Sequence, residues 1–583
     1  MKRFLSIIVA LAGMLLLLAA CQPETVEVTR VITETVTEQI EVTRIVEGEV
    51  QTETIEVTRI IEVEAEPEAA PETTRLRIAI VGDESTLHPY TYVTGYPGWN
   101  LLLLQYDTLY QLDGDGVPQP WLATAAEVSD DGLTVTIDLR DDVAWHDGEP
   151  FTAADVTFSY EYYKEHTEAG RFTRDLRPIA STEVDGDYRV ILTLAAPSPS
   201  LELGTLADVP IIPEHIWSAV EAPAEHVFES GTNVGTGPFI LTEYEADRFY
   251  RFVANENYWA GKPAVDELVA IQFADDAGAL AAFRSREADM IVDPVSPEQI
   301  NLMAAMNDVE VLQGPLFTTQ MLNYDMERAP FNHAAVRQAI SLAVDRQDLI
   351  DTVYLGAATP GSAGWIHPAS PLFNPAVETL YDPEQAGTLL DEAGITDSDG
   401  DGIRELDGQP LSFEFITPGA DSLRLRIAEL VREMLLVVGI DAQVIAVEQG
   451  TWEDAVWPEF DVAQGRDYDM AMWGWSAPVQ ADPVRLSSLI HSDPAIGSLN
   501  LTGYVNEEAD ALSEELNSAT DPDRRAELIG RLQEIIAEEM PFVLLLYPDG
   551  AYTFWGDVYD GWQFMTGQGI FHKLSLLPEE ARP

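Results

Sequence analysis

Cysteine is almost absent from this sequence, since Cys21 is the only one in 583 residues. A single thiol excludes an internal disulfide framework and a cysteine-based zinc site. Catalytic motifs are missing as well: the chain has no GxxxxGK[ST] phosphate loop, no HExxH and no GxSxG. The nine histidines never pair at metal-ligand spacing. We therefore expect a protein that is not an enzyme.

Positive charge is also scarce. Lys and Arg number 32, of which only four are Lys, against 100 Asp and Glu, and the formal net charge is -68. Such a field repels nucleic acid and anionic lipid, so we expect neither as a partner. The acidity fits a salty habitat or a GC-rich genome, and both remain open. Hydrophobic content of 46% and twelve Trp indicate a folded chain, and its length indicates two or three domains.

One apolar run stands at the N-terminus. Lys2 and Arg3 precede residues 4–18, which are too few for a membrane span, and Leu18-Ala19-Ala20-Cys21 follows. The segment resembles a signal peptide that ends in a lipobox. We predict that residues 1–20 are removed and that Cys21 carries the lipid anchor, outside the cytoplasmic membrane. The alternative is a stray thiol at the end of a membrane anchor.

Residues 21–74 form an island rich in Glu, Thr, Val and Ile. A unit repeats in it, as Val26–Arg30, Ile40–Arg44 and Ile55–Arg59. We interpret the island as an elongated tether that is helical or coiled-coil-like. The β-branched residues and short alternations also fit a strand, and an unstructured acidic linker is the further alternative.

Residues 127–163 combine a strand, a turn and a helix start. Apolar and polar residues alternate from Leu133 to Leu139, as in a strand with one buried face. Asp147-Gly148 suits a tight turn. Thr152 and Asp155 have the spacing of a capping box at a helix start. This pattern predicts a structural element without chemistry of its own.

The order of these residues resembles a known signature. The pattern DG.T.T..LR..V.WHDG.P.TA.DV.FS is similar to a segment of the extracytoplasmic solute-binding proteins of the peptide/nickel ABC importers, family 5. Residues 234–268, with VGTGPF and NYWAGKP, resemble the second signature of that family. Shorter matches at 283–289 and 322–340 follow in the same order. The resemblance extends from Arg75 almost to the C-terminus.

The resemblance implies an α/β, two-lobe periplasmic-binding-protein-like fold of type II, in the three-domain variant of family 5. It also implies the following division of the chain: domain I from residues 75–106, 233–325 and 550–583, an inserted domain II at 107–232, and domain III at 326–549.

The resemblance implies that aromatic side chains line the solute pocket. Trp99, Trp452 and Trp475 match the family's pocket positions, with Tyr96 and Phe317 as further candidates. For each Trp, core packing is the alternative. Peptide-binding members carry GW.aDy.dP, whose first Asp holds the peptide ammonium group. Here Pro478 takes that place and only Asp482 remains, so a saccharide or another neutral solute becomes an alternative to a peptide.

One segment has the character of a calcium loop. Asp397, Asp399 and Asp401 stand at alternate positions with Gly402 at the sixth, as in an EF-hand, but the twelfth residue is Gly408 and not Glu. Structural Ca²⁺ is one interpretation, and an Asp/Gly turn between helix and strand is the other. No other cofactor is expected.

The resemblance implies a lipid-anchored receptor on the extracytoplasmic face of the membrane. It would bind a small solute, a peptide or an oligosaccharide, and deliver it to ABC permease subunits, as a monomer and without catalysis. A sensory receptor with the same fold is an alternative. A tethered hydrolase and a structural surface protein are further rivals, which the missing motifs and the ordered matches disfavour.

Overall fold

The computed structural model describes residues 31–46, 49–64, 74–91, 97–169, 171–227, 233–377, 379–476 and 482–583. It divides into two units, Met1–Thr73 and Thr74–Pro583, and each is described by itself. Among the described helices, none is long and apolar enough to cross a membrane.

The first unit contains two strands, and the helical prediction for the tether is therefore wrong over these residues. Strands β1 (Val31–Val46) and β2 (Glu49–Glu64) pair antiparallel, with Ile40 opposite Ile55. Val, Ile and Thr are frequent in both, and β-branched residues favour extended backbone because their χ1 angles are restricted. The repeat Val26–Arg30 and Cys21 lie outside the described residues.

A twelve-stranded sheet runs through the second unit, and the predicted α/β class is confirmed. Its strand order is β10-β11-β12-β3-β13-β22-β15-β21-β19-β20, and β14 and β16 also pair with β22. The strands are β10 (Phe239–Glu245), β11 (Phe249–Ala254), β12 (Glu267–Phe273), β3 (Arg75–Val81), β13 (Met290–Ile291), β22 (Val543–Trp555), β15 (Gln320–Tyr324), β21 (Met470–Trp473), β19 (Ser412–Pro418), β20 (Asp441–Val447), β14 (Val309–Pro315) and β16 (Ala358–Pro360).

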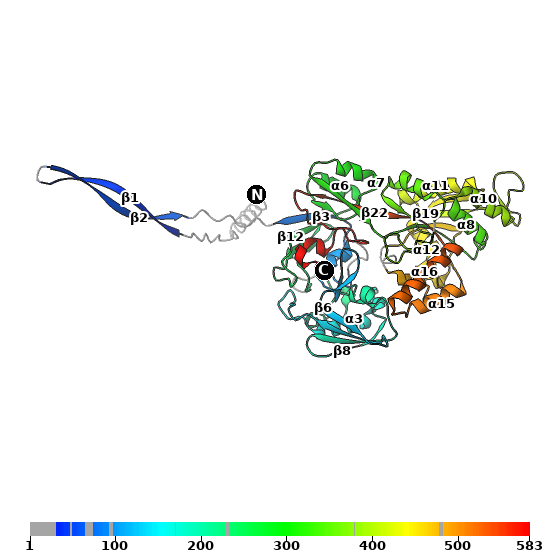
Figure 1. Ribbon diagram of the computed structural model, residues 1–583, viewed down its shortest axis with the longest axis horizontal. Helices are drawn as coiled ribbons and strands as arrows, with labels where there is room; N and C mark the ends of the chain where they lie inside the picture. The colour runs from blue at the N-terminus through cyan, green and yellow to red at the C-terminus, as the bar shows by residue number, and fades with distance from the viewer. Residues whose placement is uncertain are drawn as a thin grey trace, which may run out of the picture. The chain divides into compact units, whose positions relative to one another are not determined.

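Strand β22 connects two halves of this sheet (Figure 1). Residues 546–548 pair with β16, and residues 549–555 pair with β14. We call residues 74–315 and 549–583 the first lobe, and residues 320–548 the second lobe. The predicted boundary at 549/550 falls inside β22, and the predicted domain limits remain predictions.

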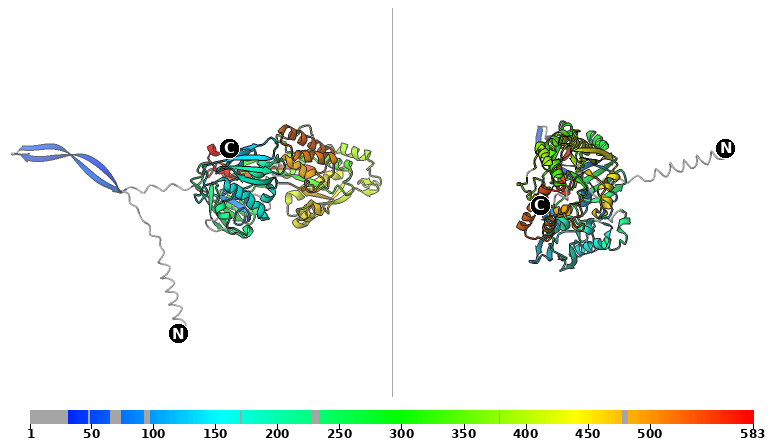
Figure 2. Two further views of the ribbon diagram at one scale, coloured as in Figure 1. Left: turned by 90° about the horizontal axis from the view of Figure 1, so that it is seen from below. Right: turned by 90° about the vertical axis from the view of Figure 1, so that its right-hand side faces the viewer.

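Helices pack beside both halves of the sheet (Figures 1 and 2). The first lobe carries α6 (Asp276–Arg284) and α7 (Pro297–Ala304). The helices of the second lobe that matter below are α8 (Ala334–Ala343), α10 (Pro383–Glu392), α11 (Ser422–Val437), α12 (Gln449–Val456), α15 (Glu507–Leu516) and α16 (Pro522–Glu539).

The first lobe also contains a separate four-stranded antiparallel sheet, β6-β7-β9-β8. Its strands are β6 (Ala123–Val128), β7 (Thr134–Leu139), β9 (Arg189–Leu194) and β8 (Ile179–Val184), with helix α3 (Ala153–Glu165) alongside. The buried residues of β7 are Val135, Ile137 and Leu139, as the alternation predicts. The backbone N–H of Thr152 donates to the carboxylate of Asp155 at 2.9 Å, so the predicted capping box starts α3.

The two signature segments meet at His146. Its Nε2–H donates to the carbonyl oxygen of Gly237 at 2.9 Å, and its Nδ1 accepts from the amide of Gly235 at 3.2 Å. Burial lowers the pKa of His146, which favours this neutral ring. A Cβ at Gly235 would lie 1.8 Å from the carbonyl oxygen of Gln105, so this close approach requires glycine. His146 therefore has a structural role.

Asp107 joins remote segments inside the first lobe. Its fully buried carboxylate accepts from Trp121 Nε1 at 2.9 Å, Thr236 Oγ1 at 3.1 Å and Tyr258 hydroxyl at 3.1 Å. Lys573 Nζ donates to it at 2.6 Å. Because each donor comes from a different part of the chain, the carboxylate holds the segments of the first lobe together.

Candidate functional site

Three parallel strands of the second lobe end at one edge of the sheet. They are β19, β20 and β21, and β19 pairs in parallel with both of the others. Ligands of open α/β sheets bind outside the carboxyl ends of such strands. Here these ends lead into the start of α11, into α12 with Trp452, and into Gly474-Trp475. Two predicted pocket residues therefore belong to one edge of the sheet.

Four tryptophans form a cluster at this edge, defined here as Trp452, Trp457, Trp473 and Trp475. The ring centroids of Trp452 and Trp473 lie 4.5 Å apart, those of Trp473 and Trp475 5.7 Å, and those of Trp457 and Trp475 5.5 Å. Trp452 is 4% exposed and Trp475 is 8% exposed, so both also serve the core. The buried indole N–H groups of Trp457 and Trp473 have no hydrogen-bond partner among the described residues.

A tight backbone contact holds Trp475 in place. Its amide donates to the hydroxyl of Thr319 at 2.8 Å, and the amide of Thr319 donates to the Trp475 carbonyl at 3.0 Å. A Cβ on Gly474 would lie 2.3 Å from the Thr319 carbonyl oxygen. The approach of the two segments therefore depends on glycine at position 474.

Arg424 borders the tryptophan cluster. It lies in the first turn of α11, with its guanidinium carbon 5.4 Å from the centroid of the Trp452 ring. Its Nε donates to Gln320 Oε1 at 3.0 Å and lies 3.5 Å from Asp421 Oδ2. Burial lowers the pKa of Arg424, although the neighbouring Asp421 carboxylate opposes this shift. The edge thus combines apolar rings with one cation.

The remaining aromatic candidates lie elsewhere or outside the described residues. Trp99 is 4% exposed and packs in the core of the first lobe, with its ring centroid 6.0 Å from that of Phe172. Phe317 is half-buried in a left-handed backbone conformation, with φ of 59°, and its ring centroid lies 4.9 Å from that of His367. Tyr96 is outside the described residues. The structure thus brings Trp452 and Trp475 together and places Trp99 in a separate core.

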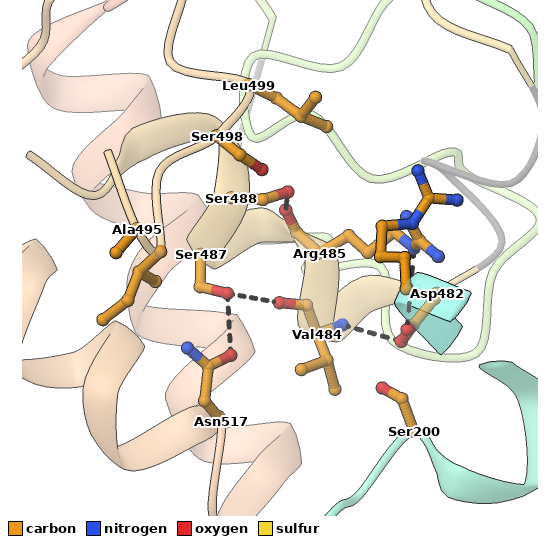
Figure 3. Close-up of a pocket in the computed structure, with 12 residues that line it drawn as sticks. Ser200, Asp482, Val484, Arg485, Ser487, Ser488, Ala495, Ser498, Leu499 and Asn517 are labelled. Carbon is orange, nitrogen blue, oxygen red and sulfur yellow. Dashed lines mark hydrogen bonds and ion pairs between the residues drawn. The ribbon is translucent and has the colours of Figure 1, made fainter. Parts of the chain in front are cut away.

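Asp482 lines a cavity of about 380 Å³ that both lobes share (Figure 3). Arg174 and Ser200 come from the first lobe. The second lobe contributes Asp482, Val484, Arg485, Ser487, Ser488, Ala495, Ile496, Ser498, Leu499 and Asn517. Serines, one amide and two arginines give this lining many hydrogen-bonding groups.

The carboxylate of Asp482 is partly committed to its own turn. One oxygen accepts from the amide of Val484 at 3.1 Å, and Arg485 Nε lies 3.9 Å from the other. Asp482 is 8% exposed. It therefore shapes the short helix that follows it as well as lining the cavity, and the uncharged polar groups of Ser487 and Asn517 lie next to each other elsewhere in the lining (Figure 3).

The acidic loop gathers four carboxylates. Oxygens of Asp397, Asp399, Asp401 and Glu405 lie within 4.8 Å of one another, and in the described part of the chain this is the one group of three or more His, Cys, Asp or Glu so close together. The amide of Gly402 donates to the Asp397 carboxylate at 3.0 Å and folds the loop. This donor set of oxygens suits a hard cation such as Ca²⁺.

Sequence reasoning missed three residues of the strand edge. Trp473 stands next to Gly474 at the end of β21, Trp457 follows α12, and Arg424 stands in the first turn of α11. Their common signal is that each ends a strand of this edge or belongs to the segment that follows such a strand in the chain. That signal can be read from a sequence only when the strand order is known.

Comparison with known proteins identifies the family. Residues 117–496 match the profile of the bacterial extracellular solute-binding proteins, family 5 (middle region). A Brucella ovis protein named as an ABC transporter peptide-binding protein is 32% identical over 373 residues, which are 64% of this chain and 66% of that protein. The match thus spans slightly less than two thirds of that relative. The oligopeptide-binding protein AppA of Bacillus subtilis is 26% identical over 476 residues, 80% of this chain and 85% of its own length.

Solved structures have the same fold. NikA from Brucella suis, in complex with Fe(III)-EDTA, superposes with a TM-score of 0.75 and 26% identity, over 86% of this chain and 99% of NikA. AppA from Bacillus subtilis, in complex with a nonapeptide, superposes with a TM-score of 0.68 and 24% identity, over 87% and 99% of the two chains. With the profile match across more than half of the chain, these findings confirm the resemblance: the chain belongs to the bacterial extracellular solute-binding proteins of family 5.

Proposed function

We propose that this protein is the solute-binding component of an ABC importer and that it captures a small organic solute between its lobes. The observation that carries the proposal is the cavity to which Arg174 and Ser200 contribute from one lobe and Asp482 and Ser488 from the other. A solute in such a cavity contacts both lobes at once. Membership in family 5, and relatives named as peptide-binding components of ABC transporters, support the same function.

The mechanism is a change in the population of a closed form. A solute that contacts both lobes has higher affinity for the closed arrangement than for an open one, and therefore stabilises it. The lobes also touch directly, because Arg525 Nη1 donates to the carbonyl oxygen of Pro199 at 3.0 Å. The permease subunits would recognise the closed form, and the ATPase on other chains would supply the energy. No reaction is catalysed.

Oligopeptides are the first class of solute to consider, because the names of several relatives point to them. Pro478 replaces the Asp that holds the peptide ammonium group in peptide-binding members, so a peptide would need another anchor. The tryptophan cluster gives a second candidate class, since flat apolar rings also stack on saccharides. One relative is named as a nickel-binding periplasmic protein. The four close carboxylates of the acidic loop lack the imidazole that favours nickel.

We place the protein outside the cytoplasmic membrane, as family membership indicates. The finer proposal is a monomer anchored through lipid at Cys21 and held by the segment up to residue 74. A sensory receptor with the same lobes is the alternative, and genes for a permease and an ATPase beside this one would distinguish the two.

A thermal-shift panel tests the proposal. Short peptides and oligosaccharides are added to the purified protein, and a solute at a hundred times its Kd stabilises the folded state by ~2.7 kcal/mol. We expect at least one class to raise the Tm. The variant Ser200→Trp fills the shared cavity and should abolish this shift. Ser181→Trp, on the exposed face of β8, is the matched control and should keep it. A shift that survives in Ser200→Trp would contradict the assignment of the cavity.

A further inference from the structure

The side chain of Arg525 reaches from the second lobe to the first. Arg525 lies in the first turn of α16, and its Nη1 donates to the backbone carbonyl oxygen of Pro199 at 3.0 Å. These two residues are 326 positions apart in the sequence and belong to different lobes. The hydrogen bond between them can therefore exist only while the lobes are close together.

The other two arginines of α16 have partners inside the second lobe. Arg524 Nε lies 2.7 Å from a carboxylate oxygen of Glu515. Arg531 Nε lies 2.9 Å from a carboxylate oxygen of Glu508. Within the described residues Arg525 forms no such ion pair, and its side chain donates to the carbonyl oxygen of the first lobe. Arg525 thus differs from its neighbours in serving the contact between the lobes.

A turn of the four-stranded sheet packs against the same part of the second lobe. Gly132 stands in the turn between β6 and β7 in a left-handed conformation, with φ of 70°. A Cβ built on it would lie 3.1 Å from Cβ of Pro197 and 3.4 Å from Cγ2 of Thr520. Thr520 directly precedes Asp521, the N-cap of α16. The turn therefore approaches the second lobe beside the start of the helix that carries Arg525.

The first-lobe side of this contact is restrained before the lobes meet. Residues 196–200 read APSPS, and each proline ring fixes its own φ angle. The amide of Leu201 donates to the carbonyl oxygen of Ser198 at 3.2 Å, so the segment folds into a turn. The Pro199 carbonyl consequently loses little backbone freedom when it accepts the hydrogen bond from the other lobe.

This contact adjoins the solute cavity but is separate from it. In the described part of the chain, neither Arg525 nor Thr520 lines the cavity. Ser200, which follows Pro199, does line it (Figure 3). Because the contact uses only atoms of the protein, its strength does not depend on the chemistry of the solute.

We propose that Arg525 and Thr520 of the second lobe form a latch with Pro199 and Gly132 of the first, and that this latch stabilises the closed arrangement without solute. The latch adds the same free energy to the closed form whichever solute is bound. It therefore changes the affinity for all solutes by one common factor. The effect on affinity rests on the proposed function, whereas the effect on the lobes concerns the free protein.

Spin labels measure the lobe arrangement without any solute. In the mature chain, Cys21→Ser removes the native thiol, and Glu183→Cys and Glu514→Cys place one label at an exposed position of each lobe. Double electron–electron resonance then gives the distribution of distances between the labels. Arg525→Met keeps the length of the side chain but removes its donors. It should lower the ratio of closed to open forms by ~10-fold, because a hydrogen bond from a charged donor contributes about this factor.

Two further variants separate the latch from other effects. Arg524→Met is the matched control, since it removes the same charge from the neighbouring position and should keep the distances of the wild type. Thr520→Trp leaves the arginine intact but places a bulky ring against the Gly132 turn, and it should lengthen the distances. Unchanged distances in Arg525→Met, or an equal change in Arg524→Met, would overturn the proposal.

Calorimetry with trialanine and with maltotriose measures the effect on binding. Each of these probes that binds should bind Arg525→Met more weakly by the same factor, and should bind Arg524→Met as it binds the wild type. A loss of affinity for one probe and not for the other would contradict a latch that acts on all solutes alike. If neither probe binds, the proposed function loses support, while the distances between the labels still decide whether the latch exists.

Discussion

Two basic side chains, Lys573 in the first lobe and Arg424 in the second, occupy opposite kinds of surroundings. Lys573 is 1% exposed at its side chain and lies 2.6 Å from Asp107, whose carboxylate also accepts four neutral donors. Arg424 is 19% exposed and has one neutral acceptor and an offset carboxylate. A fully buried cation in direct contact with a carboxylate stabilises the fold strongly when both partners are present, whereas a more exposed cation in a looser pair contributes less.

The largest effect is expected from breaking the buried ion pair between Lys573 and Asp107. Lys573→Met leaves the Asp107 carboxylate buried without its cation, and removal of one partner of such a pair costs ~3–5 kcal/mol of the free energy of unfolding. Urea unfolding followed by circular dichroism measures this loss. Lys262→Met is the control, because Lys262 pairs with Asp266 at the surface and its loss should barely move the midpoint. If Lys573→Met and the wild type unfold at the same urea midpoint, the Lys573–Asp107 pair does not stabilise the first lobe, and its contrast with Arg424 is lost.

A second prediction concerns acid, and it uses the neighbour of Lys573. Burial lowers the pKa of His572 to about 4, against 6.5 in the unfolded chain. Above pH 6.5 the His572 ring is neutral in the folded and in the unfolded chain, so its burial does not lower the free energy of unfolding. As the pH falls from 6.5 towards 4, His572 binds a proton in the unfolded state but stays neutral in the folded state. The free energy of unfolding therefore falls by ~3 kcal/mol.

Urea midpoints between pH 7 and about pH 4 measure this loss, and His572→Gln should flatten the decline. His333→Gln is the matched control, because it removes an imidazole from an exposed position. If the decline is as steep in His572→Gln as in the wild type, the buried ring is not its source. Buried His88 and His367, whose pKa values burial also lowers to about 4, should maintain part of the slope in every variant.

The smallest effect is expected at the exposed acidic loop of the second lobe. Calcium should bind the carboxylates of Asp397, Asp399, Asp401 and Glu405. At a calcium concentration several times the Kd, the free energy of unfolding should rise by ~1 kcal/mol, and the Tm should rise with it. Chelator should reverse the shift. Asp399→Asn should abolish it, whereas Asp407→Asn, at an exposed residue outside the group, should not. If calcium does not change the Tm, the loop is only a turn between helix and strand and has no calcium site.

Local rules and signature segments predicted the framework well. Val135 and Ile137 are buried as alternation requires, Thr152 and Asp155 form their capping box, and the α/β class follows from the resemblance. Each of these properties depends on residues a few positions apart or on a segment already known from the family.

The tether and the strand edge were harder to predict for different reasons. Residues 31–64 satisfy helical spacing and β-branched propensity at once, and the paired strands show that propensity prevailed. Trp452 and Trp475 were predicted as pocket residues, and the structure puts them in one cluster. Arg424 was missed because its contacts with Gln320 and Trp452 join residues on three separate elements. Such contacts exist only after β15, α11 and α12 have been arranged in space.

The continuity of β22 limits how the lobes can move. Its residues 549–555 form a ladder with β14, and residues 546–548 form a ladder with β16, with no break in the strand between them. Each ladder lies within one lobe, so a rotation between the lobes can leave both ladders intact and be absorbed by torsion of a few residues of the strand. Pro548, Asp549 and Gly550 stand where the strand changes its partner, and we expect such torsion there. A rotation of this kind would twist one shared strand and keep the pairing of each lobe unchanged.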